Sequence, residues 1–346
     1  MKKECTKERI GIAAGGNWIV DHIKTVDRLP ERGMLASILS QSRSAGGAPA
    51  NVLADLAQLR APFPLEGYGV IGDDADGTYI LDAFRRAGVR VDGLQRTDRQ
   101  PTSYTDVMTE RETGDRTFYH RRGANALFAP EHVPLDGLRC RIFHLGYILL
   151  LDQLDAPDPE CGTVAARLLR DLRERGIRTS VDVVSEAGDR FGTLVPPALA
   201  HSDYAILNEI EAARAAGLSA RDAAGRLDRT ALQTAMRRLR QMGPMRLLAV
   251  HMPEGAVLLT DRGEWLAFGS LELPGGYIRS AVGAGDAFCA GLLYGLHEGW
   301  PLPECARLAQ CTAATSLAAE GASEGVLPLE ETLALAARYP ARCPPL

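Results

Sequence analysis

The chain has 346 residues but only four lysines, Lys2, Lys3, Lys7 and Lys24, all of them near its start. No residue further along can therefore be a Schiff-base lysine or the lysine of a phosphate-binding loop, and the pattern G-x-x-x-x-G-K-[ST] is absent. If the protein handles phosphate groups, it must do so with backbone N–H groups, arginines and a metal ion.

The seven cysteines and seven histidines lack the spacings that mark metal sites. There is no C-x-x-C pair and no H-x-H or H-x-x-x-H pair, which argues against a zinc centre. An odd number of unpaired cysteines also fits buried thiols in a reducing compartment better than a disulfide framework.

Long apolar runs and basic blocks are missing as well. No stretch approaches the roughly 20 apolar residues that span a bilayer, and the net charge of −5 argues against a nucleic-acid-binding protein. We therefore expect a cytoplasmic protein whose partner is a small molecule, with no membrane or nucleic-acid partner. A hydrophobic content of 46% is enough to fill one large core.

Strand and helix patterns alternate along the chain, which predicts a mostly parallel sheet covered by helices on both faces. We expect a single α/β domain over residues 1–346, with a small β lid formed by segments at about 22–45 and 102–120. The second lid segment has the pattern of a hairpin with its turn at 112–115. The other expected strands are 8–16, 64–72, 140–148, 176–184, 201–208 and 245–252, and the expected helices include 50–59 and 77–88.

One glycine pattern, G-x-G-x-x-G at 67–72, is typical of dinucleotide-binding turns when it joins a strand to a helix. Here apolar residues alternate through the glycines, and the turn comes only after Gly72. We interpret these glycines as part of a strand, so the pattern does not indicate a dinucleotide site.

A second small-residue turn, Gly283-Ala284-Gly285-Asp286, leads into an apolar helix that continues to about 296. The exposed N–H groups and the dipole at the start of a helix attract a negative group, and small side chains let phosphate oxygens approach the backbone. Asp286 would stay ionised there and is suited to accept a proton from an attacking hydroxyl. The alternative is that Asp286 only caps the helix.

Four further motifs accompany this turn: Gly46-Gly47-Ala48-Pro49-Ala50-Asn51, the segment 69–77, the lid turn 114–117, and Asn208-Glu209-Ile210-Glu211. With these motifs, in this order, the chain resembles the PfkB, or ribokinase-like, family of carbohydrate kinases. The resemblance implies a ribokinase-like three-layer α/β/α sandwich with a mostly parallel central sheet and a small β lid. It also implies ATP-dependent phosphorylation of a hydroxymethyl group on a sugar or sugar derivative, with Mg²⁺ as the metal.

The same resemblance implies a role for each site residue. Asp286 is the general base, and the anion hole consists of the N–H groups of Gly283, Ala284 and Gly285. The acceptor is bound by Asp21, Gly46, Gly47 and Asn51. The nucleotide side consists of Asn208, Glu211, Gly255 and Gln310, with Glu211 holding Mg²⁺ through water. Without the resemblance, Asn208 to Glu211 would be interpreted as a helix start, Asp21 as a solvated acid and Gly46-Gly47 as a turn.

The sequence departs from the family in two places. Ser280 and Ala281 stand where the family usually has Asp-Thr, an acid that commonly helps to bind a monovalent cation, and only Gly255 remains of a glycine turn against the nucleotide. We therefore expect no potassium activation, with the turn ordered by packing of Ala281 and Val282.

Several alternatives stay open at this point. The protein could be a nucleoside kinase, with Trp18, Phe118 or Tyr119 stacking on a base, or a catalytically weak sugar or nucleotide sensor. The lid is expected to pair with that of a second subunit in a homodimer. Its arginines at 116, 121 and 122 are candidates for binding an acidic acceptor.

Overall fold

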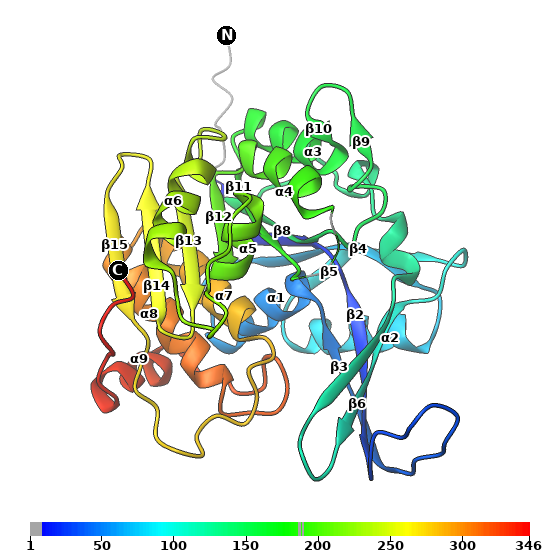
Figure 1. Cartoon of the computed structure of the whole chain (residues 1–346). Coiled ribbons are helices and arrows are strands. Elements are labelled where there is room, and N and C mark those ends of the chain that lie inside the picture. Colours follow the sequence, from blue (N-terminus) through cyan, green and yellow to red (C-terminus); the bar gives the residue numbers. More distant parts are fainter. Residues whose placement is uncertain (1–8, 186–187, 189) are drawn as a thin grey trace.

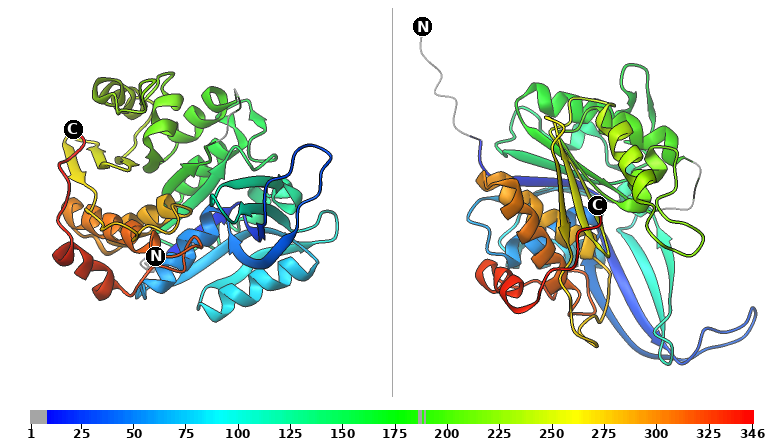
Figure 2. Two further views of the ribbon diagram at one scale, coloured as in Figure 1. Left: turned by 60° about the horizontal axis from the view of Figure 1, so that its bottom comes forward. Right: turned by 60° about the vertical axis from the view of Figure 1, so that its left-hand side comes forward.

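The computed structural model describes residues 9–185, 188 and 190–346 (Figure 1). A large central sheet separates two layers of helices, and a second, smaller sheet projects from one end of the molecule (Figures 1 and 2). In the part of the chain that the structure describes, the central sheet consists of β1 (Ile12–Gly16), β4 (Leu65–Gly72), β5 (Arg90–Thr97), β8 (Ile142–Ile148), β11 (Arg178–Val183), β12 (Tyr204–Asn208), β13 (Leu247–Met252), β14 (Gly255–Thr260) and β15 (Trp265–Gly269).

The spatial order of these strands is β15-β14-β13-β12-β11-β8-β1-β4-β5. All neighbours from β13 to β5 are parallel, whereas β14 and β15 are antiparallel at one edge. The predicted α/β class and mostly parallel sheet are thus confirmed. The strands from β13 to β5 are parallel, so their carboxyl ends all lie at the same end of the sheet. Open parallel sheets bind ligands at this end.

Apolar helix faces bury both sides of the sheet. One core joins it to α3, α4, α5 and α6, and the other joins it to α1, α2, α7 and α8, with α9 packed on α8. The bounds of the helices are α1 (Ala48–Gln58), α2 (Ala75–Arg86), α3 (Val164–Glu174), α4 (Phe191–Ala200), α5 (Glu209–Ala215), α6 (Arg229–Arg240), α7 (Ala284–Glu298), α8 (Leu302–Ser316) and α9 (Leu329–Arg338). Short elements complete the chain: 3-10 turns at Gly123–Leu127 and Pro130–His132, and a two-stranded ribbon of β9 (Pro157–Asp158) and β10 (Gly162–Thr163). Among the described residues, no helix combines the length and the apolar character needed to cross a membrane.

The G-x-G-x-x-G pattern lies inside β4, as its alternation predicted. Its glycines make room for the indole of Trp18, since a Cβ at Gly67 or Gly69 would come within 2.8 Å of that ring. The indole is fully buried, and its Nε1 donates to the carbonyl oxygen of Tyr68 at 2.8 Å. Trp18 is therefore a core residue, and the suggestion that it stacks on a base is wrong.

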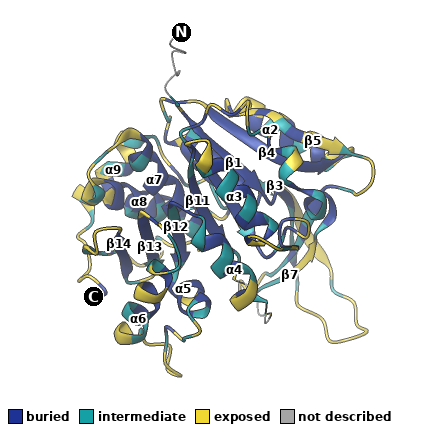
Figure 3. Cartoon of the chain, turned by 90° about the horizontal axis from the view of Figure 1, so that it is seen from above, coloured by how far each residue is buried: buried dark blue, intermediate teal, exposed yellow. Residues whose placement is uncertain are grey.

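The lid is a four-stranded sheet built from the two segments expected to form it. Its strands are β2 (Ile19–Val26), β3 (Ile38–Gly46), β6 (Ser103–Glu110) and β7 (Arg116–Arg121). They lie in the order β3-β2-β6-β7, with β2 and β6 parallel and the other pairs antiparallel. The predicted hairpin is β6–β7, and Figure 3 shows that the far end of the lid is largely exposed, in contrast with the buried central sheet.

Candidate active site

A cleft of about 710 Å³ lies at the carboxyl ends of β8, β11, β12 and β13, and the start of α7 forms one of its walls. Gly283 caps α7 with φ +77°, a conformation that disfavours a side chain. A Cβ at this position would also overlap the carbonyl oxygen of Ala322. Gly283, Ala284, Gly285 and Asp286 all line the cleft, so the predicted turn does begin a helix that faces a cavity.

Asp286 lies in the first turn of α7 with only 5% of its surface exposed. Its Oδ2 accepts a hydrogen bond from Nδ2 of Asn51 at 2.7 Å and one from the hydroxyl of Tyr147 at 3.0 Å. Burial raises the pKa of Asp286 above its usual range, and the charge of nearby Asp182 acts in the same direction. The two hydrogen bonds favour the carboxylate, so this group is poised to exchange a proton.

Two residues beside Asp286 were missed by the sequence analysis. Tyr147 lies near the end of β8 and Asp182 near the end of β11, and both line the cleft. His144 supports Asp182 from within the sheet, with Nε2 and Oδ2 3.4 Å apart. No sequence motif includes Tyr147 or Asp182. Their positions near the ends of two predicted strands were the signal that the sequence offered.

Asn208 and Glu211, which the resemblance assigns to the nucleotide, both line the cleft. They form a reciprocal capping box at the start of α5, in which each side chain accepts a hydrogen bond from the other's backbone N–H at 2.8–2.9 Å. Oε1 of Glu211 also accepts from Ser185 at 2.7 Å. Burial raises the pKa of Glu211 to about 7, with smaller contributions from the charges of Asp182 and Asp286. The motif Asn208 to Glu211 therefore begins a helix and also lines the cleft.

Gly255 and Gln310 line the same cleft, Gly255 at the turn between β13 and β14 and Gln310 on α8. Gly255 has φ +153°, and a Cβ there would overlap the carbonyl oxygen of Phe268. His251, one of the residues that departs from the family's turn, also lines the cleft beside Gly285. Burial lowers the pKa of His251 to about 4, so it is neutral at physiological pH.

The residues expected to bind the acceptor lie at the base of the lid and on α1. Gly46 ends β3 next to Asp21 on β2, where a Cβ would come 2.7 Å from Oδ2 of Asp21. Gly47 caps α1 with φ +93°, and Asn51 follows in its first turns and donates to Asp286. Burial raises the pKa of Asp21 to about 6, against the opposing effects of a hydrogen bond with Thr105 and the charge of His22. The structure thus brings Gly46 close to Asp21 and links Asn51 directly to Asp286.

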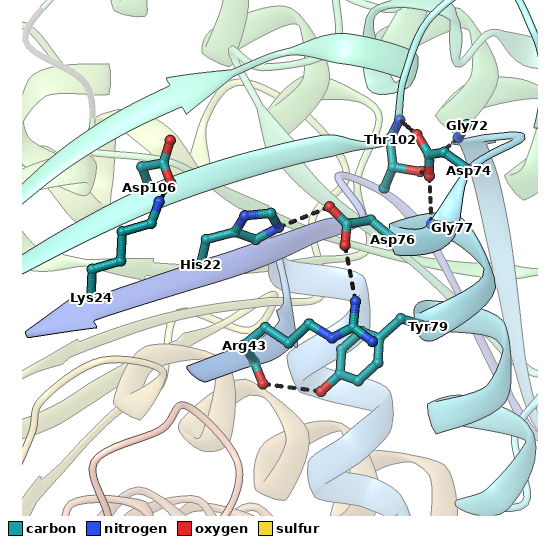
Figure 4. Close-up of polar contacts among 10 residues, drawn as sticks. All are labelled: His22, Lys24, Arg43, Gly72, Asp74, Asp76, Gly77, Tyr79, Thr102 and Asp106. Carbon is teal, nitrogen blue, oxygen red and sulfur yellow. Dashed lines mark hydrogen bonds and ion pairs between the residues drawn. The ribbon is translucent and has the colours of Figure 1, made fainter. Parts of the chain in front are cut away.

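The lid is anchored to the start of α2 by a polar cluster (Figure 4). Asp76 accepts from Nε2 of His22 at 2.8 Å and is paired with Arg43 of β3 at 3.4 Å. The guanidinium of Arg43 lies over the ring of Tyr79, whose hydroxyl donates to the carbonyl oxygen of Arg43 at 3.1 Å. The motif segment 69–77 therefore holds the lid on the body.

Neighbouring contacts in this cluster fix the lid strands themselves. Asp74 caps α2 and accepts from the backbone N–H of Thr102, at the start of the hairpin, at 2.7 Å. Lys24 of β2 pairs with Asp106 of β6. The start of α2 therefore holds both parts of the lid: Asp76 contacts β2 and β3, and Asp74 contacts the β6–β7 hairpin.

The far end of the lid reaches the segment before the turn Gly283 to Asp286. Nη1 of Arg116, on β7, donates to Oγ of Ser280 at 3.3 Å, and the same oxygen accepts from the backbone N–H of Val282 at 3.1 Å. The expected packing of Ala281 and Val282 is wrong, since both are exposed, Val282 by 39%. The hydrogen bonds of the buried Ser280 hydroxyl order this segment instead. Ala281 and Val282 are exposed, so they pack against no apolar core.

This contact supports the prediction on monovalent cations. A guanidinium beside Ser280 repels a second cation, and a serine hydroxyl supplies no negative charge to offset that repulsion. We expect activity in potassium chloride to match activity in a bulky organic cation salt of equal ionic strength within about threefold, or about 0.65 kcal/mol of barrier. A tenfold activation that saturates at millimolar potassium would show that backbone carbonyls alone form a cation site.

Asp55, on the buried face of α1, carries a separate prediction about pH. It is fully buried, and burial together with the charge of Asp286 raises its pKa well above the usual range, although Ser323 acts in the opposite direction. Because the folded-state pKa exceeds the unfolded one, stability is highest below the unfolded pKa and falls as pH rises through the folded pKa. We expect Asp55→Asn to be more stable than the parent at pH 8, by at least about 1 kcal/mol, and to lose less stability between pH 5 and pH 8.

Urea unfolding at the two pH values measures this difference. Asp92→Asn, at an exposed position on β5, is the matched control and should leave the pH dependence unchanged. Equal pH dependence in the parent and in Asp55→Asn would contradict the prediction.

Comparison with known proteins identifies the family and the fold. The model of the pfkB family of carbohydrate kinases matches residues 10–329. An ATP-dependent ribose-1-phosphate kinase of Halopiger xanaduensis is 29% identical over 82% of the chain and 83% of its own length. A sugar kinase of Escherichia coli is 31% identical over 84% of the chain and 74% of its own length. The structure of Arabidopsis thaliana ribokinase with ribose and ATP superposes with a TM-score of 0.77 at 22% identity, covering 94% of this chain and 98% of that one.

The fold and the matched family define a phosphotransferase with a ribokinase-like architecture. The chain belongs to the pfkB family of carbohydrate kinases. The family resemblance and the ribokinase-like fold expected from the sequence are therefore confirmed.

Proposed function

We propose that the protein transfers the γ-phosphoryl group of ATP to a hydroxymethyl group of a sugar or sugar derivative, with Asp286 as general base. The observation that carries this proposal is the place of Asp286, at the start of α7, with Asn51 of the acceptor side and Tyr147 of β8 both hydrogen-bonded to it. An acceptor hydroxyl that displaces one of these partners meets a carboxylate with a raised pKa.

Gly283, Ala284 and Gly285 line the cleft at the positive end of the α7 dipole, and the N–H of Ala284 donates to the carbonyl oxygen of Ala281 at 3.3 Å. In this mechanism their backbone N–H groups stabilise negative charge on the transferring group. Arg116 lies at the edge of the same turn, held by Ser280. It adds positive charge where the phosphates of a nucleotide in the cleft approach the lid.

The carboxylates of the cleft suit Mg²⁺, a hard cation that prefers oxygen ligands. The buried Oδ1 of Asp182 has no hydrogen-bonding partner among the described residues, and Glu211 lies on the same wall. No group of three acidic, histidine or cysteine side chains in the described ranges is close enough to hold an ion by itself. We assign Glu211 as a ligand through water, with phosphate oxygens completing the shell, and the metal would neutralise phosphate charge.

The names of two similar proteins support the proposal that ATP and a sugar are the substrates. The Halopiger relative is an ATP-dependent ribose-1-phosphate kinase, and the Arabidopsis ribokinase was solved with ribose and ATP. A nucleoside kinase of Methanothermobacter thermautotrophicus is 22% identical over 91% of the chain. Burial of Trp18 removes one of the three aromatic rings proposed to stack on a base, so the structure offers the nucleoside alternative less support.

ADP formation with a panel of acceptors tests the proposal. The panel contains ribose, ribose 1-phosphate, fructose, a keto-deoxy sugar acid and adenosine, each with ATP and Mg²⁺, and phosphorus NMR identifies the product. We expect at least one sugar to be phosphorylated on its hydroxymethyl group. Turnover of adenosine alone would establish the nucleoside kinase, and nucleotide binding without turnover of any acceptor would favour the sensor.

Two of the three lid arginines that were candidates for binding an acidic acceptor already have partners within the protein. Nη1 of Arg122 pairs with Asp152 at 2.6 Å, and Arg116 is bonded to Ser280. Arg121 ends β7 and remains the candidate for a carboxylate or phosphate on the acceptor. The keto-deoxy acid and ribose 1-phosphate in the panel therefore also test this residue, through the KM of Arg121→Ala.

The homodimer remains a prediction, and the exposed lid supports it. Leu35 is 89% exposed and Met34 69%, and Ile38, Phe118 and Tyr119 are also more than half exposed. A monomer that leaves so many large apolar side chains in water is unusual, and pairing two lids would bury them. We expect light scattering to show a dimer at micromolar concentration, and Leu35→Asp with Ile38→Asp to shift it toward monomer. A parent protein that is monomeric and fully active would contradict this arrangement.

A further inference from the structure

A group of arginines lies at the amino ends of the central strands, on the edge of the sheet opposite the catalytic cleft. Arg141 immediately precedes β8, Arg178 begins β11, and Arg246 immediately precedes β13. Register places them in one row, since Arg178 pairs with Ile142 and Tyr204 pairs with Leu247. A second cavity, of about 450 Å³, opens there and is lined by Arg9, Arg141, Ile142, Gly176, Arg178, Tyr204, Arg246 and Leu296.

No carboxylate is among the described residues that line this arginine pocket. One acid, Asp203, lies beneath it with a side chain only 2% exposed, and it forms ion pairs of 3.3 Å with Arg173, Arg178 and Arg246. Among the residues that the structure describes, this one carboxylate is shared by three guanidinium groups. The side chains of Arg178 and Arg246 remain 42% and 46% exposed, so part of each guanidinium faces solvent.

Arg9 adds positive charge at the other side of the pocket. Its guanidinium donates to the carbonyl oxygens of Leu138 at 2.9 Å and Arg175 at 2.7 Å. Carbonyl groups satisfy its hydrogen bonds and fix its position, but they do not neutralise its charge. Arg9, Arg178 and Arg246 thus place three positive charges around the pocket, against the carboxylate of Asp203 among the described residues, in a protein whose net charge is −5.

We propose that the arginine pocket is a second anion site, which binds a small molecule carrying two or more phosphate groups. Guanidinium groups recognise phosphate oxygens through paired N–H donors, and several of them converge here on one cavity. Neighbouring strands are about 4.8 Å apart, so the row from Arg246 to Arg141, three strand spacings, spans roughly 14 Å. One phosphate reaches only part of that row, whereas two or three phosphates extend along it.

The volume of the pocket also favours a compact ligand. A cavity of 450 Å³ is at the small end of the range for metabolite sites. Among the described residues that line it, Tyr204 has the one aromatic ring, so no second ring is available there to sandwich a base. This site is independent of the proposed phosphoryl transfer, because none of its residues lines the catalytic cleft.

Isothermal titration calorimetry with the full chain tests the proposal, in 150 mM sodium chloride and without divalent metal. The probes are inorganic tripolyphosphate, fructose 1,6-bisphosphate and orthophosphate. We expect binding of tripolyphosphate or the bisphosphate, and the stronger of the two tells whether the site takes a phosphate chain or phosphates separated by a carbon skeleton. We expect orthophosphate to bind at least tenfold more weakly.

Variants assign the binding to this pocket. Arg178→Gln and Arg246→Gln should each weaken the polyphosphate affinity at least tenfold. Arg85→Gln removes an arginine on α2 whose side chain is 59% exposed, and it should leave the affinity unchanged. If loss of a partner for Asp203 unfolds the first two variants, Arg9→Gln avoids that carboxylate and should weaken binding by the same mechanism. Absence of binding in the parent protein, or affinities within twofold of it in all folded pocket variants, would overturn the proposal.

Discussion

Asp286→Asn is expected to lower kcat by at least about 10²-fold, because general-base assistance contributes typically ~10² to 10⁴ in rate. The substitution keeps the shape of the side chain, and an amide oxygen can still accept from Tyr147 or Asn51. Because burial already disfavours the charge of Asp286, removing that charge should not destabilise the fold. Steady-state kinetics and thermal unfolding of the same preparation measure the two effects.

Asp228→Asn is the matched control for this experiment. Asp228 caps α6 and accepts from the backbone N–H of Ala231 at 2.9 Å, away from the residues that line the cleft. Asparagine caps helices as well as aspartate does, so kcat should not change. An Asp286→Asn enzyme that keeps more than about a tenth of the parent turnover would remove the base assignment and leave Asp286 as a helix cap.

Gly283→Ala is expected to lower kcat by about 10²-fold through the anion hole. The new Cβ would overlap the carbonyl oxygen of Ala322, so the turn must move, and its N–H groups would no longer point to the same place. Loss of one such donor costs typically ~10² to 10³ in kcat. The left-handed conformation adds about 1–2 kcal/mol of strain, which thermal unfolding measures separately.

The other end of the same helix provides the control. Gly299 follows α7 with φ +73°, nearly the same conformation as Gly283, but no atom lies within 4 Å of a Cβ placed there. Gly299→Ala should therefore lose similar stability to strain and keep its kcat. If both variants lose activity to the same extent, global destabilisation explains the effect and the anion-hole assignment fails.

Much of this architecture could be predicted because the relevant signals are local. Alternation of apolar residues places Gly67 and Gly69 in a strand, and small residues followed by Asp286 mark the start of a helix. Asn208 and Glu211 are three residues apart, which is the spacing of a capping box. In each case the backbone conformation depends on neighbours within a few residues, so the sequence pattern is sufficient.

The wrong expectation that Ala281 and Val282 are packed shows what local sequence patterns cannot predict. Two small apolar residues in a turn pack only if a core lies beside them, and here that side of the turn faces solvent and the lid. The contact between Arg116 and Ser280 joins residues 164 positions apart. No pattern within either segment indicates that they meet.

The sequence by itself thus determined the alternation of strands and helices, the α7 turn with its acid, and the family to which the chain belongs, whereas β5, β14 and β15 were not predicted. Only the tertiary structure decided which strand ends converge. Tyr147 and Asp182 become neighbours of Asp286 because β8 and β11 are adjacent and parallel, and Arg141, Arg178 and Arg246 form a row at the opposite edge for the same reason. Strand order follows from how the helices bury both faces of the sheet, a property of the whole chain that no short segment contains.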